Sequence, residues 1–166
     1  PDAPHYLITL LANDDIEVAY SILNNSAVLE DEDLIEVIRH RTQEYNLAIA
    51  VRNKVSEEVS DVLVKSGDES VVTTLLKNSG SAISQTTMEF LVEESKRVDA
   101  YQEPILRRDD LDPDLAKRMY LWVTAALRKY ILKNFDLDKT VLNDLLEKSA
   151  DAAPDETPTK SDELAE

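Results

Sequence analysis

The stretch Leu76-Lys-Asn-Ser-Gly-Ser-Ala-Ile83-Ser-Gln-Thr-Thr-Met88 predicts the fold class of this chain. It reads as the end of one helix, a short polar link with one apolar residue, and the start of a second helix. Ser84 can act as the N-cap of the second helix, because its hydroxyl can accept a hydrogen bond from an otherwise unpaired backbone N–H. Ile83 and Met88 have the spacing of a hydrophobic staple, which sets the angle at which the chain enters a helix. The stretch therefore predicts two helices joined by a tight link.

The same pattern occurs four times along the chain, which indicates an internal repeat. The apolar link residues are 26, 28 and 28 positions apart, and they are Leu29, Val55, Ile83 and Leu111. Ser56 and Asp112 are further N-cap candidates, and Pro113 stands where a first helical residue needs no N–H donor. Elsewhere apolar residues recur at helical spacing, and no segment alternates with the period of a strand. We therefore expect an all-α protein.

A helix pair of this length cannot bury both of its apolar stripes alone, so it must stack on its neighbours. We expect a short α-solenoid, with repeats shorter than the usual armadillo or HEAT lengths. An irregular helical bundle whose links look alike by chance is the alternative. A partial helix at 5–12 and a closing helix at 138–149 would flank the expected pairs, which cover residues 14–41, 42–66, 68–98 and 101–135.

The composition changes near residue 149. Residues 149–166 contain two prolines, six acidic residues, one lysine and no aromatic residue. Such a segment buries too little apolar surface to offset the entropy lost on ordering. We therefore expect a helical-repeat domain over residues 1–148 and an acidic, Pro-containing tail or linker over 149–166. The chain starts with Pro1 instead of Met, which we interpret as an excised domain, with any targeting signal or partner domain outside it.

The composition also excludes several classes of function. Two glycines cannot supply a Gly-rich phosphate loop, and without cysteine there is no disulfide, thiolate metal site or thiol nucleophile. The only histidines, His5 and His40, show no metal-ligand spacing. Carboxylate pairs are abundant, but most stand at helix starts, where carboxylates are usually solvated and keep ordinary pKa values. We predict no catalytic residue, no cofactor and no metal site, and hence that the protein is not an enzyme.

One segment departs from the acidic average. The whole chain carries 34 acidic and 18 basic residues, a net charge of −16, which disfavours nucleic acid and anionic membranes as partners. Residues 107–133 instead carry seven bases and four acids, a net charge of +3. A helix over 115–135 would place its basic residues and the tryptophan along one side. We predict that this side binds a partner through Arg118, Trp122, Lys129 and Lys133.

Three interpretations of this basic side stay open. Trp122 could pack in the core while the bases pair with acidic neighbours, the side could bind an acidic protein partner, or it could bind a phosphate or nucleic-acid ligand. The sequence favours the first of these, and the partner of the second is unidentified. An exposed tryptophan between cations would favour the other two.

The run Leu11-Ala-Asn-Asp-Asp-Ile16-Glu-Val-Ala19, continued by Ser26, Leu29 and Asp31-Glu-Asp-Leu34, resembles a known family. This is an uncharacterised, mostly alphaproteobacterial family of HEAT-like helical-repeat proteins, a domain of unknown function. The pieces Leu47-Ala-Ile-Ala50, Val59-Ser-Asp-Val-Leu63 and Leu75-Leu-Lys-Asn78 are similar to its repeats. The resemblance covers about residues 10–130 and leaves out the tail after 149. It implies HEAT-like antiparallel helix pairs, a right-handed superhelix of about 9–10 helices, and no established activity.

These observations favour a non-catalytic protein–protein interaction or scaffold module, which could be the regulatory part of a longer bacterial signalling protein. The alternative is nucleic-acid or phosphate-ligand binding through the basic helix 115–135, by analogy with helical-repeat DNA-repair enzymes. No apolar run reaches the roughly 20 residues that cross a bilayer, so we expect a cytoplasmic protein with no membrane partner. Homo-oligomers stay open. A contiguous apolar or aromatic stretch along one groove would mark the interface.

Overall fold

The computed structural model describes residues 16–26, 29–40, 43–135 and 146–147. Over these residues it is all-helical, with nine α-helices, one 3-10 helix and no strand. Its contacts divide the chain into two compact units, Pro1–Asp109 and Asp110–Glu166, which we call unit 1 and unit 2. No helix in the described part is long and apolar enough to span a membrane.

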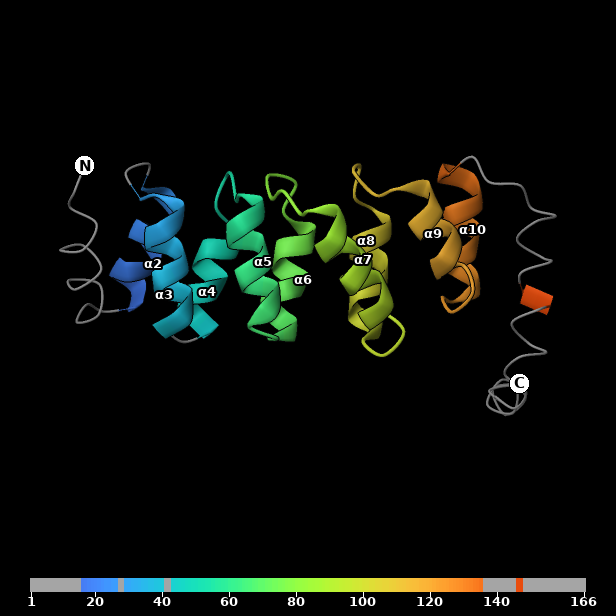
Figure 1. Ribbon diagram of the computed structural model, residues 1–166, viewed down its shortest axis with the longest axis horizontal. Coiled ribbons are helices and arrows are strands. Elements are labelled where there is room, and N and C mark those ends of the chain that lie inside the picture. Colours follow the sequence, from blue (N-terminus) through green and yellow to red (C-terminus); the bar gives the residue numbers. More distant parts are fainter. Residues whose placement is uncertain (1–15, 27–28, 41–42, 136–145, 148–166) are drawn as a thin grey trace. The chain divides into compact units, whose positions relative to one another are not determined.

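Unit 1 contains the expected helix pairs over 14–41, 42–66 and 68–98, as far as these ranges are described (Figure 1). Residues 99–106 form a 3-10 helix, η1, which continues directly into a last short helix. The helices are α2 (Ile16–Asn25), α3 (Asp31–His40), α4 (Gln43–Ala50), α5 (Glu57–Lys65), α6 (Glu69–Lys77), α7 (Gln85–Glu94), η1 (Asp99–Tyr101) and α8 (Gln102–Leu106).

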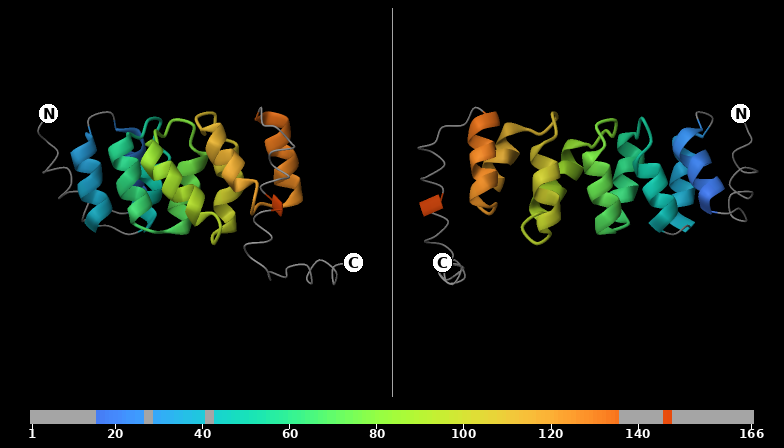
Figure 2. Two further views of the ribbon diagram at one scale, coloured as in Figure 1. Left: turned by 45° about the vertical axis from the view of Figure 1, so that its right-hand side comes forward. Right: turned by 180° about the vertical axis from the view of Figure 1, so that it is seen from behind.

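The helices of unit 1 pack on their second neighbours along the chain. The even-numbered helices form one row, in which α2 packs on α4, α4 on α6 and α6 on α8. In the other row α3 packs on α5, and the rows also contact each other, as α3 with α4 and α5 with α6. Successive helices run in opposite directions (Figures 1 and 2). The links at 51–56 and 78–84 therefore lie at the same end of the unit, at the top of Figure 1.

The apolar residue of each repeated link is buried, as the pattern predicts. In unit 1 the exposed fractions of Leu29, Val55 and Ile83 are 6%, 2% and 8%. Val55 also joins two links directly, because its N–H donates to the Gly80 carbonyl at 3.1 Å and its carbonyl accepts from the Ala82 N–H at 2.8 Å. The link that contains Val55 and the link that contains Gly80 and Ala82 are therefore in direct contact.

The predicted N-caps are confirmed. Ser56 Oγ accepts from the Val59 N–H at 3.1 Å, and Ser84 Oγ accepts from the Thr87 N–H at 3.2 Å. The sequence reading missed a further cap, Asp68, which accepts from the Val71 N–H at 3.1 Å at the start of α6. Each cap satisfies one of the N–H groups that a helix start leaves unpaired.

The helix ends are connected by a series of side-chain donors, which we call the cap series. Each donor stands in one link and hydrogen-bonds to backbone carbonyls at the end of the helix two positions earlier. The donors are Arg52, Asn78 and Arg108. Arg52 donates to the carbonyls of Leu23 and Ser26 at the end of α2. A buried helix end needs such partners for its last carbonyls.

Two further steps of the cap series repeat this arrangement. The Asn78 side-chain amide donates to the Ala50 carbonyl at 2.8 Å, at the end of α4. Arg108 Nη1 donates to the Leu76 carbonyl at 3.0 Å, at the end of α6, and Nη2 donates to the Ser81 carbonyl at 2.7 Å. The even-numbered row is therefore held together at one end by side-chain to backbone hydrogen bonds.

The two glycines occupy links for different reasons. Gly67 follows α5 with φ +79, a left-handed conformation that favours glycine after a helix. Gly80 has no positive φ, but a Cβ there would overlap the Asn53 carbonyl oxygen. Gly67 is therefore a helix-ending glycine, whereas Gly80 allows two links to approach closely.

Unit 2 contains α9 (Pro113–Met119) and α10 (Ala125–Asn134) among its described residues. Asp112 caps α9 by accepting from the Asp114 N–H at 2.9 Å, Pro113 occupies the first turn, and Leu111 is 5% exposed, all as predicted. The continuous helix expected over 115–135 is wrong, because the chain turns between Tyr120 and Thr124.

The cause of this break is a second N-cap. Thr124 has extended backbone angles, and its hydroxyl accepts from the Leu127 N–H at 3.3 Å, so a new helix starts there. The preceding Trp122 N–H bonds to the Met119 carbonyl at 3.0 Å, in a tighter turn than an α-helix. Threonine competes with helix continuation because its side chain can bond to nearby backbone. The helices expected at 5–12 and 138–149 and the boundary at 148 lie largely or wholly outside the described residues.

Candidate functional site

A groove of about 1050 Å³ opens between α5 and α7 in unit 1. One wall is α5 and the other is α7, and the rest of the lining comes from α6, η1 and the links around these helices. Every lining residue belongs to unit 1. The groove is the concave site that the structure offers most clearly, and the sequence analysis did not locate it.

The two walls are joined by a polar contact. Thr87 Oγ1 on α7 donates to Asp61 Oδ1 on α5 at 3.0 Å, and the Ser84 hydroxyl donates to Thr87 Oγ1, also at 3.0 Å. Ser84 also caps α7, so the start of this wall is held by its own link. Asp61 Oδ2 lies 3.1 Å from Lys65 Nζ one turn further along α5. The hydrogen bond from Thr87 to Asp61 therefore links the two walls directly.

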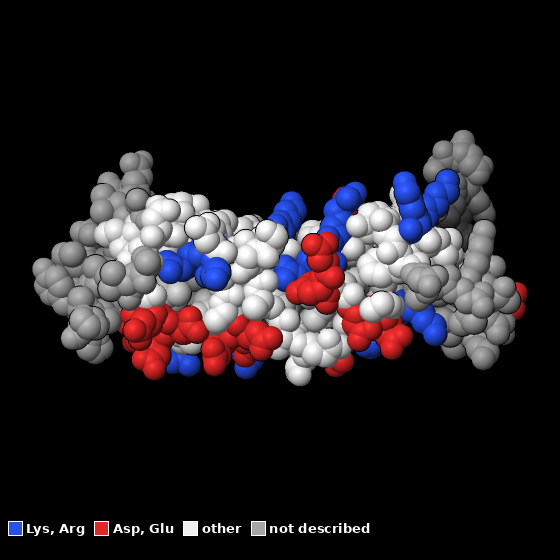
Figure 3. Space-filling model, turned by 90° about the horizontal axis from the view of Figure 1, so that it is seen from above, with Lys and Arg blue, Asp and Glu red and all other residues white. Residues whose placement is uncertain are grey.

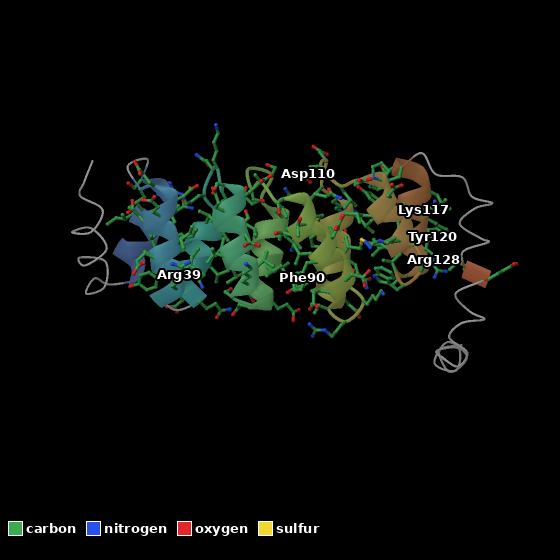
Figure 4. The ribbon with its side chains drawn as sticks, in the orientation of Figure 1. Arg39, Phe90, Asp110, Lys117, Tyr120 and Arg128 are labelled. Atoms are coloured by element: carbon green, nitrogen blue, oxygen red, sulfur yellow. The ribbon has the colours of Figure 1, made fainter. Side chains whose placement is uncertain are left out.

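The apolar part of the groove is partly open to solvent. Phe90 on α7 is 52% exposed, which is the largest value among the exposed large apolar residues of the described chain (Figure 4). Beside it the lining reaches the core through side chains that are at most 6% exposed, namely Val64, Val72, Leu91 and Tyr101. An exposed aromatic residue next to a concave apolar lining is typical of an interaction site.

The charged part of the lining is mostly acidic. Five carboxylates and two bases give the lining a net charge of −3, and the carboxylates belong to Glu57, Glu58, Asp61, Glu69 and Glu94. Both bases are already in ion pairs, Lys65 with Asp61 and Arg97 with Glu94. Figure 3 shows the acidic side chains near α3 and α5 as red groups along one edge of unit 1.

Three of the groove carboxylates have no ion pair among the described residues. Glu57 and Glu58 stand in the first turn of α5, and Glu69 stands in the first turn of α6. Their charges complement the positive end of each helix dipole. They leave acceptor capacity directed at solvent, which a cationic side chain of a ligand could use.

Tyr101 reports the electrostatics of the groove. Burial raises the pKa of its hydroxyl above the ordinary value, and the carboxylates of Glu69 and Glu94 raise it further because they repel the phenolate. Arg97 opposes this effect. Asp68 also raises this pKa, so three carboxylates act against one base around Tyr101.

The structure separates the residues of the predicted basic site. Arg118 is on α9, Trp122 lies in the turn, and Lys129 and Lys133 are on α10. Trp122 is half-buried, whereas the other three are exposed. They do not line one side of a single helix, so that geometric expectation is wrong, and their predicted role in binding a partner stays a prediction.

Another base of this segment has a structural role. Arg128 Nε donates to the Tyr120 carbonyl at 2.8 Å, and Nη2 donates to the Leu121 carbonyl at 3.2 Å. Its guanidinium also lies 5.2 Å from the centre of the Tyr120 ring (Figure 4). Arg128 thus pairs with the carbonyls that follow α9 and holds the turn to α10, through backbone carbonyls and not through the acidic neighbours that the first interpretation expects.

The remaining candidate chemistry is sparse in the described residues. No group of three or more His, Cys, Asp or Glu side chains there could hold a metal ion. Burial lowers the pKa of Arg52, and Asp31 partly offsets this effect. Arg52 belongs to the cap series and points at backbone carbonyls, so its shifted pKa reflects a structural position.

Over its described residues the chain is all-helical and carries an acidic groove in unit 1. Residues 18–165 match the family DUF2336, whose description is an uncharacterised protein conserved in bacteria. The chain belongs to this family. The match includes residues 149–165, so the expectation that the tail falls outside the family is wrong. No curated protein and no solved structure matches the chain.

Proposed function

We propose that this protein is a non-catalytic protein–protein interaction or scaffold module. The groove between α5 and α7 carries the proposal, because it combines a half-exposed Phe90 with carboxylates that have no ion pair within the described part of the chain. Exposure of a large aromatic side chain to water is unfavourable, so a partner that covers the ring gains binding free energy. A regulatory role within a longer bacterial signalling protein is the biological setting that we propose.

The proposed architecture is a short α-solenoid of HEAT-like antiparallel helix pairs with a right-handed superhelix. Its support is the packing of α2 on α4, α4 on α6, α6 on α8 and α3 on α5, together with the repeated links and the cap series. Solenoids of this kind build extended binding surfaces from successive repeats. The alphaproteobacterial distribution and the cytoplasmic location belong to the same proposal.

A second interaction surface in unit 2 is part of the proposal. Lys129 and Lys133 are exposed one turn apart on α10, an arrangement that fits an acidic protein partner. Arg118 and the half-buried Trp122 would border that surface.

Affinity capture with the full chain tests the proposed function. The chain serves as bait in an extract of the bacterium that encodes it, and the control bait is an unrelated acidic protein of similar size. We expect at least one protein that the chain retains and the control bait does not, in repeated captures identified by mass spectrometry. Retention of the same proteins by both baits would overturn the proposal.

A further inference from the structure

We propose that the groove between α5 and α7 binds a basic amphipathic helical segment of a partner protein, with an apolar side chain against Phe90 and Lys or Arg side chains against Glu57, Glu58 and Glu69. This inference rests on the proposed function and names the partner's chemistry. It concerns one site, so the interaction module can exist without it.

The shape of the groove fits a peptide segment. Its walls are helices of 9 and 10 residues, which are about 14 Å long. Its volume, about 1050 Å³, is at the upper limit of about 1,000 Å³ for small-molecule pockets. An amphipathic helix that lies in an apolar groove between helices is a recurring mode of peptide recognition.

The apolar requirement follows from Phe90. Its ring is 52% exposed, while Val72 and Leu91 beside it are at most 1% exposed. A ligand side chain placed on Phe90 would therefore contact the core directly and remove the remaining water from the ring. An apolar anchor in such a position typically supplies much of the binding free energy.

The cationic requirement follows from the pairing of charges. Lys65 and Arg97 already neutralise Asp61 and Glu94. The other three carboxylates of the lining have no internal cation among the described residues, so a ligand must bring its own. An acidic ligand would meet repulsion instead, which excludes the chain's own acidic residues 149–166 as the occupant.

Fluorescence anisotropy with designed peptides tests the inference. The first probe is a fluorescein-labelled peptide of about 14 residues, with Leu on one helical face and Lys on the other. The second has the same composition in a scrambled order, and the third has Ser in place of Leu. At about 150 mM salt, where exposed charges interact only over short distances, we expect saturable binding of the first peptide alone.

Matched variants assign the binding to the groove. Glu57→Gln/Glu58→Gln/Glu69→Gln removes the unpaired carboxylates, and Glu32→Gln/Glu44→Gln/Glu89→Gln makes the same charge change at exposed positions outside the lining. We expect the groove variant to weaken binding about tenfold and the control variant to change it less than about threefold. Equal weakening by both variants would overturn the inference, because it would show unspecific attraction.

Phe90→Ala provides the apolar test. We expect about tenfold weaker binding of the first peptide, with only a small decrease in the urea midpoint because half of the ring is already in water. Unchanged affinity for this variant would overturn the inference. Saturable binding of all three peptides would also overturn it, and so would tighter binding of the small polyamine spermine than of the first peptide.

Photo-crosslinking separates this inference from the proposed function. A photo-crosslinking amino acid replaces Phe90 in one variant and Lys129 in another, in the native bacterium. Protein crosslinks at position 90, to a segment rich in Lys or Arg, support both proposals. Crosslinks at position 129 alone leave the proposed function intact and overturn the groove inference, whereas a crosslink from position 90 to a second copy of this chain replaces the foreign partner by self-association and also overturns it.

Discussion

Asn78 and Arg108 occupy successive steps of one hydrogen-bond series. The Asn78 side chain donates to the Ala50 carbonyl at 2.8 Å, and the Asn78 carbonyl accepts from Arg108 Nη1 at 3.3 Å. Asn78 thus donates to the end of α4 and itself accepts from Arg108, which stands in the link after α8. The contact explains why polar residues with long or amide side chains recur in the repeated links.

Arg108→Ala should destabilise unit 1 by about 2–4 kcal/mol, because it leaves the carbonyls of Leu76 and Ser81 without their donor. Urea unfolding followed by circular dichroism measures the change. The control is Arg107→Ala, since the exposed Arg107 pairs with the exposed Glu103 one turn away and such pairs contribute less than about 1 kcal/mol. Equal losses for the two variants would contradict the role assigned to Arg108.

The two glycines should respond differently to substitution. Gly67→Ala should cost about 1–2 kcal/mol, the usual penalty for a Cβ in the left-handed region. Gly80→Ala should cost more than Gly67→Ala, because backbone of the neighbouring link must move to relieve the overlap with Asn53. Urea midpoints compare the two variants, and the reverse order of stabilities would show that the links are not in close contact.

The raised pKa of Tyr101 predicts a pH dependence of stability. A group whose pKa is higher in the folded state stabilises the fold below its unfolded pKa of about 10, and this stabilisation is lost as pH rises through the folded pKa. Above about pH 10 the free energy of unfolding of Tyr101→Phe should therefore decrease less steeply with pH than that of the wild-type chain. Urea unfolding over a pH series measures the slopes.

A substitution in the groove should change the same pKa. Glu69→Gln removes a carboxylate that repels the Tyr101 phenolate, so the pKa of Tyr101 should fall toward its ordinary value. Ultraviolet absorbance of the phenolate follows the titration, with Glu89→Gln, an exposed residue of α7 outside the lining, as the control. If both variants titrate like the wild type, the two side chains are not electrostatically coupled.

Thr124→Ala should weaken the start of α10 by about 1 kcal/mol, because the Leu127 N–H loses its acceptor. Trp122, the only tryptophan of the chain, lies two residues away and reports the change by fluorescence during urea unfolding. Thr86→Ala on the exposed surface of α7 is the control. A gain in stability for Thr124→Ala would indicate that the chain prefers one continuous helix over 115–135.

Much of the helical architecture could be predicted because it depends on local chemistry. Ser56 and Ser84 cap the expected helices, and the apolar residues of the links are buried where the pattern placed them. The N-cap rule did not identify Thr124, because a threonine inside an apolar run is also compatible with a helix interior. The sequence likewise does not show whether a basic side chain faces solvent, and Arg128 donates to a backbone carbonyl within the fold.

The groove could not be predicted from the sequence. Its lining comes from residues between 57 and 101, and no spacing links Phe90 to Glu57 or Glu69 before the helices are placed. The only available signal was Phe90 at the start of the apolar run Phe90-Leu91-Val92 in a capped helix, which also fits an ordinary surface residue. Tertiary packing, which brings the two walls together, supplies the missing information.

The cap series also limits which sequence changes this protein can accept during evolution. Its acceptors are backbone carbonyls, which every residue carries, so the helix ends can exchange side chains freely without losing a bond. The donors, however, must arrive at a fixed distance after the preceding helix. Substitutions in the helix ends should be well tolerated, whereas insertion or deletion of one residue in the links at 51–56 or 78–84 should be damaging. Relatives of this chain should therefore differ in the amino-acid sequence of their helix ends and have links of the same length.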